Sequence, residues 1–202
     1  MRLIFEFRWC KTAGIRRHVA CCRSAVRYDE RMRELLARYK YRGSEKLAPL
    51  MAAMLAFAYE QLVRAAPTCA PHAITAVPLA RERQEERGFN QAEQMARTVA
   101  AWYGIPYVPL LQRSRHTQKQ SLKNRRSRLQ DMKGAFTLTS IQRLQALRSH
   151  QPQPLRILLA DDIYTTGSTM NECAATLQTS GSVDRGDPSR DPVVYGMLWA
   201  RS

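Results

Sequence analysis

Two adjacent carboxylates and a hydroxyl-rich turn are the groups in this sequence best suited to chemistry. Asp161 and Asp162 follow an apolar run at residues 155–160, and residues 165–169 place hydroxyl side chains around Gly167. Hydroxyls and free N–H groups at the start of a helix favour an anion such as phosphate. Carboxylates repel phosphate and suit either vicinal sugar hydroxyls or a Mg2+ ion held between hydroxyls and pyrophosphate. The pattern therefore indicates a site for a phosphorylated sugar.

Local sequence predicts the strand and the helix that would position these groups. Residues 155–160 are long enough for a strand buried on both faces of a sheet. After the turn, an apolar helical face comprises Met170, Cys173, Ala174 and Leu177. Thr169 and Glu172 have the spacing of a capping box for this helix. The alternative is a strand–turn–helix unit in which the two aspartates only cap and solvate the end of the strand.

The charge balance predicts an attraction to polyanions. The 202 residues include 32 Lys and Arg against 17 Asp and Glu, which gives a formal net charge of +15. This charge favours nucleic acid, nucleotides or pyrophosphate as partners, although a solvated basic surface would give the same composition. The 5 cysteines are an odd number without paired spacing, which argues against a disulfide framework and against a zinc site.

Chain length and hydropathy predict one ordinary α/β domain in the cytoplasm. At 202 residues the chain is long enough for a real hydrophobic core. No apolar run approaches the length of a membrane span, and Glu6 and Arg8 interrupt the apolar residues at the start. We therefore expect neither a membrane span nor a signal peptide.

A repeated strand–loop–helix unit predicts a mainly parallel sheet. The first unit has a strand at 73–77, a charged loop at 79–90 and a helix that Asn90 would cap and that ends at Gly104. The second unit is the one that contains the acidic pair. Repetition of such units favours a parallel sheet covered by helices. The remaining expected elements are an irregular arm at 1–27, helices at 29–41, 44–66 and 140–149, strands at 105–111 and 193–199, and a loop at 181–192.

Two basic segments could meet a leaving pyrophosphate group. Arg81, Arg83 and Arg87 follow the strand at 73–77, where ligands bind in open α/β sheets. Residues 112–133 carry many basic and few large apolar residues, so they predict a mobile loop that could close over a ligand. The first segment could equally be a charged surface loop, and the second a strip that binds a nucleic-acid backbone.

The acidic pair and its turn resemble the phosphoribosyl-pyrophosphate (PRPP) motif of type I phosphoribosyltransferases. Further motifs, in the right order, resemble the ComF/GntX family over about residues 25–202. They are Tyr28, Lys40-Tyr41-Arg42-Gly43, Arg87-Gly88-Phe89-Asn90-Gln91, Arg113-x-Arg115-x-Thr117-Gln118-x-Gln120 and Gly134-Ala135-Phe136. The resemblance implies a type I phosphoribosyltransferase-like fold with a mainly parallel twisted sheet flanked by helices and a helical N-terminal part.

The same resemblance implies a role for each group. Asp161 and Asp162 would be the catalytic pair and would hold the ribose 2′- and 3′-hydroxyls together with Mg2+. The 5′-phosphate would bind to Thr165, Thr166, Gly167, Ser168 and Thr169. The pyrophosphate site and the closing loop would comprise Arg81, Arg83, Arg87, Arg113, Arg115, Gln118 and Gln120.

The N-terminal region departs from the family pattern. Members usually begin with a zinc ribbon of paired Cys-x-x-Cys motifs, which are absent from this sequence. We therefore expect no protein-bound zinc, an irregular arm with a degenerate or missing ribbon at residues 1–27, and a phosphoribosyltransferase-like domain at residues 28–202.

ComF-type proteins are associated with competence, which is the handling of imported DNA. The resemblance therefore implies a phosphoribosyltransferase that takes part in DNA uptake. Such a protein would bind PRPP and release pyrophosphate. The alternative is a non-catalytic accessory protein that uses the fold to bind single-stranded DNA or a partner ATPase. A third possibility is a truncated, inactive copy. No segment of the sequence identifies the acceptor of the phosphoribosyl group.

Overall fold

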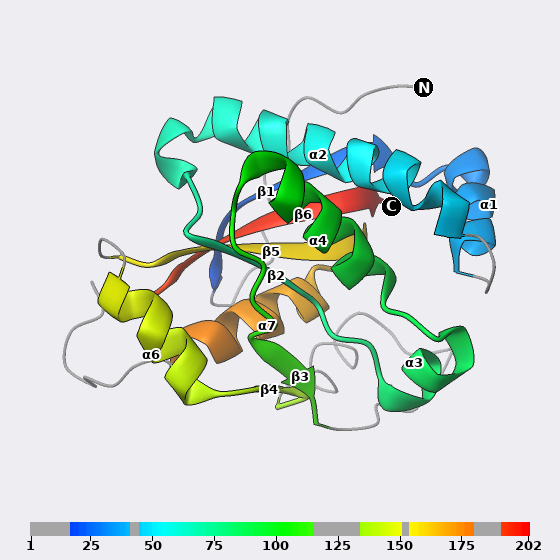
Figure 1. Ribbon diagram of the computed structural model, residues 1–202. Helices are drawn as coiled ribbons and strands as arrows, with labels where there is room; N and C mark the ends of the chain where they lie inside the picture. Colours follow the sequence, from blue (N-terminus) through cyan, green and yellow to red (C-terminus); the bar gives the residue numbers. More distant parts are fainter. Residues whose placement is uncertain (1–16, 41–44, 115–133, 151–153, 180–190) are drawn as a thin grey trace.

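A parallel sheet forms the centre of the fold. The computed structural model describes residues 17–40, 45–114, 134–150, 154–179 and 191–202. The sheet has the order β1-β6-β5-β2, and its three pairings are all parallel (Figure 1). Its strands are β1 (Val19–Arg27), β6 (Val193–Arg201), β5 (Arg156–Tyr164) and β2 (Ala73–Ala76). The prediction of an α/β fold with a mainly parallel sheet flanked by helices is confirmed.

Helices cover both faces of this sheet. Helices α2 and α4 lie on one face, and α7 lies on the other together with α6 and an antiparallel ribbon of β3 and β4 (Figure 1). The helices are α1 (Glu30–Tyr39), α2 (Ala48–Ala65), α3 (Arg81–Arg87), α4 (Gln91–Tyr103), α6 (Ile141–His150) and α7 (Ser168–Thr179). Short 3-10 turns occupy Glu45–Leu47 and Pro67–Cys69, and the ribbon strands are β3 (Leu111–Arg113) and β4 (Phe136–Leu138).

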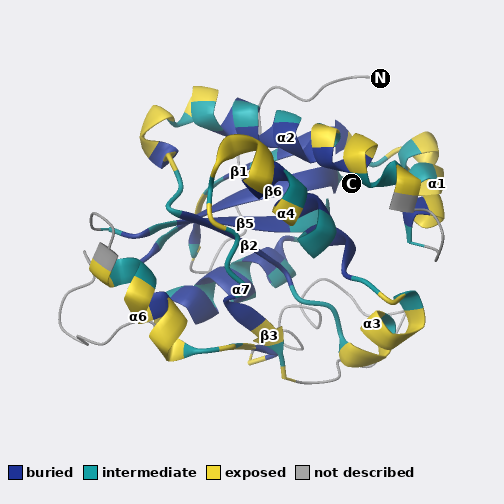
Figure 2. Cartoon of the chain, in the orientation of Figure 1, coloured by how far each residue is buried: buried dark blue, intermediate teal, exposed yellow. Residues whose placement is uncertain are grey.

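Strand β5 is buried on both faces because its residues alternate between two cores. Ile157 and Leu159 pack in the core under α7, whereas Leu158 and Ala160 pack in the core under α2 and α4. All four side chains are fully buried, and Figure 2 shows the sheet as a buried layer between the helices. The apolar run therefore has the double burial that a central parallel strand requires.

Residues 19–27 form a strand of the sheet, so the expectation of an irregular arm is wrong for them. Strand β1 pairs in parallel with β6, and Cys22, Ala25 and Val26 are buried. The sequence pattern is misleading because arginines interrupt it and because cysteine here acts as a small apolar core residue. Residues 1–16 of the expected arm lie outside the described residues.

Two further segments differ from expectation. The charged segment expected to be a loop contains helix α3, which has no buried residue and is supported by a bond from Arg81 to Glu85. The expected strand at 105–111 is reduced to a single parallel bridge between Tyr107 and Ile74, and β3 starts at Leu111. Two prolines, at 106 and 109, lack the N–H that a continuous strand would need there.

Most other predicted elements are confirmed. Asp29 caps α1 by accepting a hydrogen bond from the Met32 N–H at 2.9 Å. The helix at 44–66 is present as α2 after a 3-10 turn, while residue 44 itself lies outside the described residues. The helix expected at 140–149 is α6, and the strand expected at 193–199 is β6. Residues 115–133 of the expected mobile loop and residues 180–190 also lie outside the described residues.

Asn90 joins the end of β2 to the start of α4. Its side-chain oxygen accepts hydrogen bonds from the Ala92 and Glu93 N–H groups at 3.1 and 3.4 Å, which caps α4. Its amide nitrogen donates to the Val77 carbonyl at 3.0 Å. Because Asn90 is buried, all of these bonds are shielded from water. The predicted cap is confirmed, and the bond to Val77 fixes the segment between the strand and the helix.

Replacing Asn90 with alanine should therefore lower stability more than loss of a cap alone. We expect Asn90→Ala to reduce the free energy of unfolding by about 2–3 kcal/mol, because a helix cap is lost and the Val77 carbonyl loses its buried donor. Ser140→Ala is the control, since the Ser140 hydroxyl makes only exposed bonds, to Gln142 Oε1 and from the Arg143 N–H at the start of α6. Urea unfolding measures both variants, and equal losses would contradict the linking role of Asn90.

Candidate functional site

The acidic pair lies at a step in the edge of the sheet. The sequence suggested that the strand ends before Asp161. In the structure, strand β5 continues to Tyr164. It pairs with β6 along this extension, whereas its pairing with β2 ends at Ala160. The longer β6 supplies the partner that keeps β5 extended. Asp161 and Asp162 therefore lie beyond the end of β2, at the carboxyl edge where ligands bind in open α/β sheets.

Asp161 is held by a local bond in a partly buried position. Its Oδ1 accepts a hydrogen bond from the Asp162 N–H at 2.8 Å. Burial raises the pKa of the Asp161 carboxyl well above its ordinary value, and the negative charge of Asp162 raises it further. The bond from the Asp162 N–H and the charge of Lys40 act in the opposite direction. The cost of keeping Asp161 ionised makes a cationic or hydroxyl-bearing ligand favourable at this position.

Lys40 reaches the acidic pair from helix α1. Its Nζ lies 2.7 Å from Asp162 Oδ2, and the two side chains are only 24% and 22% exposed. Lys40 is the C-cap residue of α1, where a cation also favours the helix dipole. The sequence marked Lys40 only as part of a family motif, because its partner lies 122 positions further along the chain. The structure adds it to the residues of the candidate site.

The hydroxyl-rich turn connects β5 directly to α7. The hydroxyls of Thr166 and Ser168 lie 2.8 Å apart, and the Asn171 N–H donates to the Gly167 carbonyl at 2.9 Å. Gly167 has a φ of +77°, and a Cβ atom there would lie 2.3 Å from the Tyr164 hydroxyl. The turn therefore requires glycine both for its conformation and for the space that Tyr164 fills.

The expected capping box of this helix is wrong. Helix α7 begins at Ser168, so Thr169 lies within its first turn. Glu172 does not turn back to cap the helix, because its Oε1 accepts a hydrogen bond from the Gly134 N–H at 2.7 Å. Glu172 therefore ties α7 to the residue two positions before β4. The Ser168 N–H at the start of the helix donates to Thr166 Oγ1 at the long distance of 3.4 Å, and N–H groups at a helix start favour an anion.

The expected pyrophosphate residues separate into three groups. Arg81 and Arg113 line a common cavity, and the charge of the neighbouring Arg83 adds to burial in lowering the pKa of Arg113. Arg87 instead donates to Gln91 Oε1 at 3.0 Å and does not line this cavity. The third group comprises Arg115, Gln118 and Gln120, which lie outside the described residues.

Arg113 also lies near the acidic pair. Burial raises the pKa of the Cys173 thiol, the charge of Asp161 adds to this effect, and the charge of Arg113 opposes it. Cys173 is fully buried on the inner face of α7, as predicted. Asp161 and Arg113 are thus both close enough to one buried thiol for their charges to act on it. The charges of the β3 arginine and the β5 carboxylate therefore both act on a buried side chain of α7.

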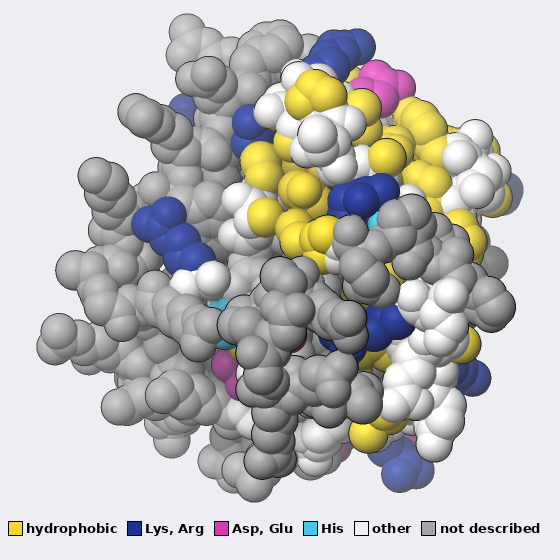
Figure 3. Space-filling view, turned by 90° about the vertical axis from the view of Figure 1, so that its left-hand side faces the viewer, with side chains coloured by type: hydrophobic (Ala, Val, Ile, Leu, Met, Phe, Trp, Pro, Cys, Tyr) yellow, Lys and Arg dark blue, Asp and Glu magenta, His cyan; other side chains and the backbone are white. Residues whose placement is uncertain are grey.

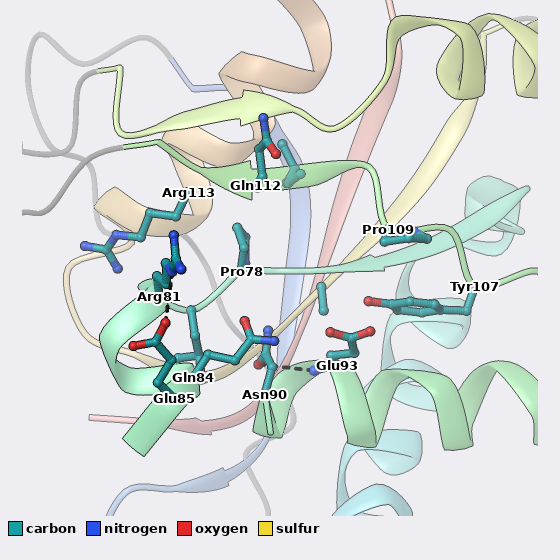
Figure 4. A pocket seen from close by; sticks show the side chains of 13 residues that line it. Pro78, Arg81, Gln84, Glu85, Asn90, Glu93, Tyr107, Pro109, Gln112 and Arg113 are labelled. Carbon is teal, nitrogen blue, oxygen red and sulfur yellow. Dashed lines mark hydrogen bonds and ion pairs between the residues drawn. The ribbon is translucent and has the colours of Figure 1, made fainter. Parts of the chain in front are cut away.

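A cavity of about 500 Å³ opens beside the end of β2 (Figure 4). Helices α3 and α4 form one side, and the segment from Tyr107 to Arg113 forms the other. The acidic pair and the turn are not among its lining residues. Its wall at Ala76 is nevertheless paired with Ala160, which directly precedes Asp161. The cavity and the acidic pair are therefore neighbours along the same edge of the sheet.

The donor set of the acidic pair fits Mg2+ better than zinc. Among the described residues, no group of three or more His, Cys, Asp or Glu side chains is placed to hold a metal. Two carboxylates suit Mg2+, which usually takes one or two protein carboxylates together with ligand phosphates and water. None of the described helices is long and apolar enough to cross a membrane.

Comparison with known proteins gives related sequences along most of the chain. The chain is 31% identical over 176 residues to Competence protein ComFC of Streptococcus pneumoniae, which covers 87% of this chain and 68% of that protein. It is 32% identical over 155 residues to Competence protein F of Haemophilus influenzae, which covers 76% of this chain and 65% of that protein. It is also 33% identical over 113 residues to DNA utilization protein YhgH of Salmonella typhi. No family model matches the chain.

Removing the charge of Lys40 should destabilise the fold in a pH-dependent way. We expect Lys40→Met to lower the free energy of unfolding at pH 7 by about 1–2 kcal/mol, because Asp162 loses its cation beside a second carboxylate. The loss should shrink as the pH falls and Asp161, whose pKa is raised, takes up its proton, because less negative charge then remains for Lys40 to offset. Urea unfolding across this range measures it. Arg38→Met removes an exposed charge from the same helix turn and should change little; a similar loss in both variants would refute a specific role for Lys40.

Asp161→Asn should instead stabilise the protein at neutral pH. The pKa of Asp161 is raised in the folded state, so the folded protein binds more protons than the unfolded chain between the ordinary and the raised pKa. The free energy of unfolding of the wild type therefore falls as the pH rises through this range. This part of the pH dependence should be absent in Asp161→Asn. Thermal unfolding from pH 4 to pH 8 tests it. Parallel pH profiles for the two proteins would contradict the raised pKa.

Proposed function

Because this chain belongs to the ComF family, we propose that it is a PRPP-binding phosphoribosyltransferase-type protein that serves DNA uptake. Its relatives are named for competence and for DNA utilization, which supports the second half of the proposal. The observation that carries the first half is the β5–turn–α7 unit, in which two carboxylates at the end of a central strand precede a hydroxyl-rich helix start.

The two halves of this unit suit the two ends of a ribose phosphate. Asp161 and Asp162 can accept hydrogen bonds from vicinal ribose hydroxyls, and both could share Mg2+ with the ligand. Bound Mg2+ would offset the charge of the pyrophosphate group. The hydroxyls of Thr165, Thr166 and Ser168 and the N–H groups at the start of α7 suit the 5′-phosphate, since both donate hydrogen bonds to an anion.

The arginines near the cavity suit the leaving pyrophosphate. The charge of Arg83 contributes to lowering the pKa of Arg113, and an anion bound near both side chains would relieve this repulsion. In the proposed transfer the acceptor atom forms a bond to ribose C1, and the bond from C1 to the pyrophosphate oxygen breaks. Pyrophosphate leaves with the electron pair of that bond, and the acceptor gives up its proton to water.

A second candidate function is non-catalytic. The net charge of +15 and the DNA-related names of the relatives favour an accessory protein that binds single-stranded DNA or a partner ATPase. Such binding would use the basic residues of 113–128, most of which lie outside the described residues. It would not require the acidic pair. The acidic pair is therefore essential to the first function alone.

Calorimetric titration of PRPP with Mg2+ tests the main proposal. We expect binding to the intact protein and at least a tenfold loss in the variant with Asp161→Asn and Asp162→Asn, because both ribose contacts are replaced. The control combines Glu34→Gln with Glu86→Gln, which removes two exposed negative charges elsewhere. The absence of a heat change with the intact protein would overturn the proposal.

The same variants separate the second candidate. If the protein is a non-catalytic accessory protein that binds DNA, fluorescence anisotropy with a labelled single-stranded oligonucleotide should show salt-dependent binding. The aspartate substitutions should leave this binding unchanged. Neutralising the basic residues of 113–128 would abolish it. Release of pyrophosphate in the presence of PRPP and a base is the readout that only the enzymatic function gives.

A further inference from the structure

The cavity beside β2 has a polar interior at one end and apolar walls. Its apolar lining comes from Ala76, Pro78, Leu79, Pro109 and Leu111. Its volume of about 500 Å³ lies within the range of roughly 300–1,000 Å³ that is usual for sites of small organic ligands. In Figure 4 the side chains of Gln84, Glu93 and Tyr107 point toward one another across this space. Space, apolar walls and convergent polar groups together are the features of a ligand site.

The convergent groups offer a defined set of hydrogen bonds. Within the described part of the chain, the side-chain amide of Gln84 and the side-chain hydroxyl of Tyr107 make no hydrogen bond, so both can serve a ligand. Burial and the charge of Glu93 raise the pKa of the Tyr107 hydroxyl, which therefore remains a donor at neutral pH. Glu93 is an acceptor, and Gln84 can donate and accept.

A second set of contacts fixes the positions of Glu93 and Tyr107. The Arg97 guanidinium donates to Glu93 Oε1 at 2.9 Å through Nε and lies 2.8 Å from it through Nη2. The same guanidinium lies 4.3 Å from the centre of the Tyr107 ring. Arg97 therefore holds one carboxylate oxygen and one face of the ring, which leaves the second carboxylate oxygen and the hydroxyl for the cavity.

We propose that this cavity binds a nucleobase that carries an exocyclic amino group. The amino group would donate to the Glu93 carboxylate, as a carboxylate accepts from the amino group of cytosine in nucleic-acid recognition. The adjacent ring nitrogen would accept from the Tyr107 hydroxyl, and the Gln84 amide would bind the remaining edge. Bases that present a carbonyl in place of the amino group, such as uracil and thymine, would meet the negative charge of Glu93.

The opposite end of the cavity suits the phosphate of a nucleotide. Arg81 and Arg113 line this end, as Figure 4 shows. On the face in Figure 3, Lys and Arg side chains lie in several separate places among hydrophobic and other side chains. The base could therefore come from a free nucleotide or from a single strand of nucleic acid, because both present the same base edge and phosphate.

The cavity lies next to the proposed ribose site. Neighbouring strands are about 4.8 Å apart, and the Val77 N–H donates to the Ala160 carbonyl at 2.9 Å. A base in the cavity and a ribose at Asp161 would thus lie side by side. A role of this base as the phosphoribosyl acceptor rests on the proposed function, whereas its binding does not.

Titration of the full chain with CMP and with UMP, in the absence of PRPP, tests the inference. We expect CMP to bind about tenfold more tightly than UMP, and AMP to behave like CMP. Tyr107→Phe removes the donor and should weaken CMP binding about fivefold or more. Glu93→Gln offers a donor to the carbonyl of uracil, so CMP and UMP should then bind within about twofold of each other.

A second pair of side chains provides a matched control. Tyr103 donates to Glu60 Oε1 at 2.8 Å on the same layer of helices but outside the cavity. Tyr103→Phe and Glu60→Gln should leave both affinities unchanged. Equal affinity of the unaltered protein for CMP and UMP would overturn the inference. It would also be overturned if Glu93→Gln and Tyr107→Phe kept the same CMP preference as the controls.

Further arms of the experiment identify the source of the base. Oligo(dC) and oligo(dT) replace the mononucleotides, and a preference for oligo(dC) that Glu93→Gln removes assigns the site to single-stranded nucleic acid. A preference seen only with mononucleotides assigns it to a free nucleotide. If PRPP does not bind but the CMP preference is present, the proposed function fails and the base site stands. If PRPP binds and no nucleotide preference exists, the base site fails alone.

Discussion

Two carboxylates on adjacent residues of a partly buried strand repel each other, and the rest of the structure must make that arrangement tolerable. Lys40 contributes most directly, at 2.7 Å from Asp162. Its position depends on α1, which Asp29 caps at one end. At the other end, the fully buried Tyr39 donates to Gln94 Oε1 on α4 at 2.6 Å. A helix that makes no part of the sheet thereby positions the cation that offsets the acidic pair near the end of β5.

Unequal strand lengths determine where ligands can approach. β5 and β6 extend side by side to Tyr164 and Arg201, whereas β2 ends at Ala76. Among the described residues, β5 therefore has no neighbouring strand on the β2 side beyond this point. The segment past the end of β2 forms α3 and then the start of α4, which Asn90 holds to Val77. This step in the sheet creates the acidic edge and the adjoining cavity together.

Local sequence predicted those features that local interactions determine. The β5 run, the Asn90 cap and the apolar face of α7 each depend on residues within one helix or strand, so their periodicity is visible. Helix α3 was missed because it has no buried face, and its support comes from an ion pair and from the Gly88 C-cap. Strand β1 was missed because its burial depends on β6, more than 160 residues away. The ion pair of Lys40 could not be predicted for the same reason, since no local pattern reports a long-range partner.

The order of the strands also bears on how the protein is made. β6 follows both β1 and β5 in the chain and lies between them in the sheet. During synthesis, β1 and the extended part of β5 present unpaired hydrogen-bonding edges until residue 201 has emerged. Such edges invite pairing with other chains, and non-local parallel pairing is slow. The sheet is therefore completed only after β6 has been synthesised, because β6 is the strand that joins β1 to β5.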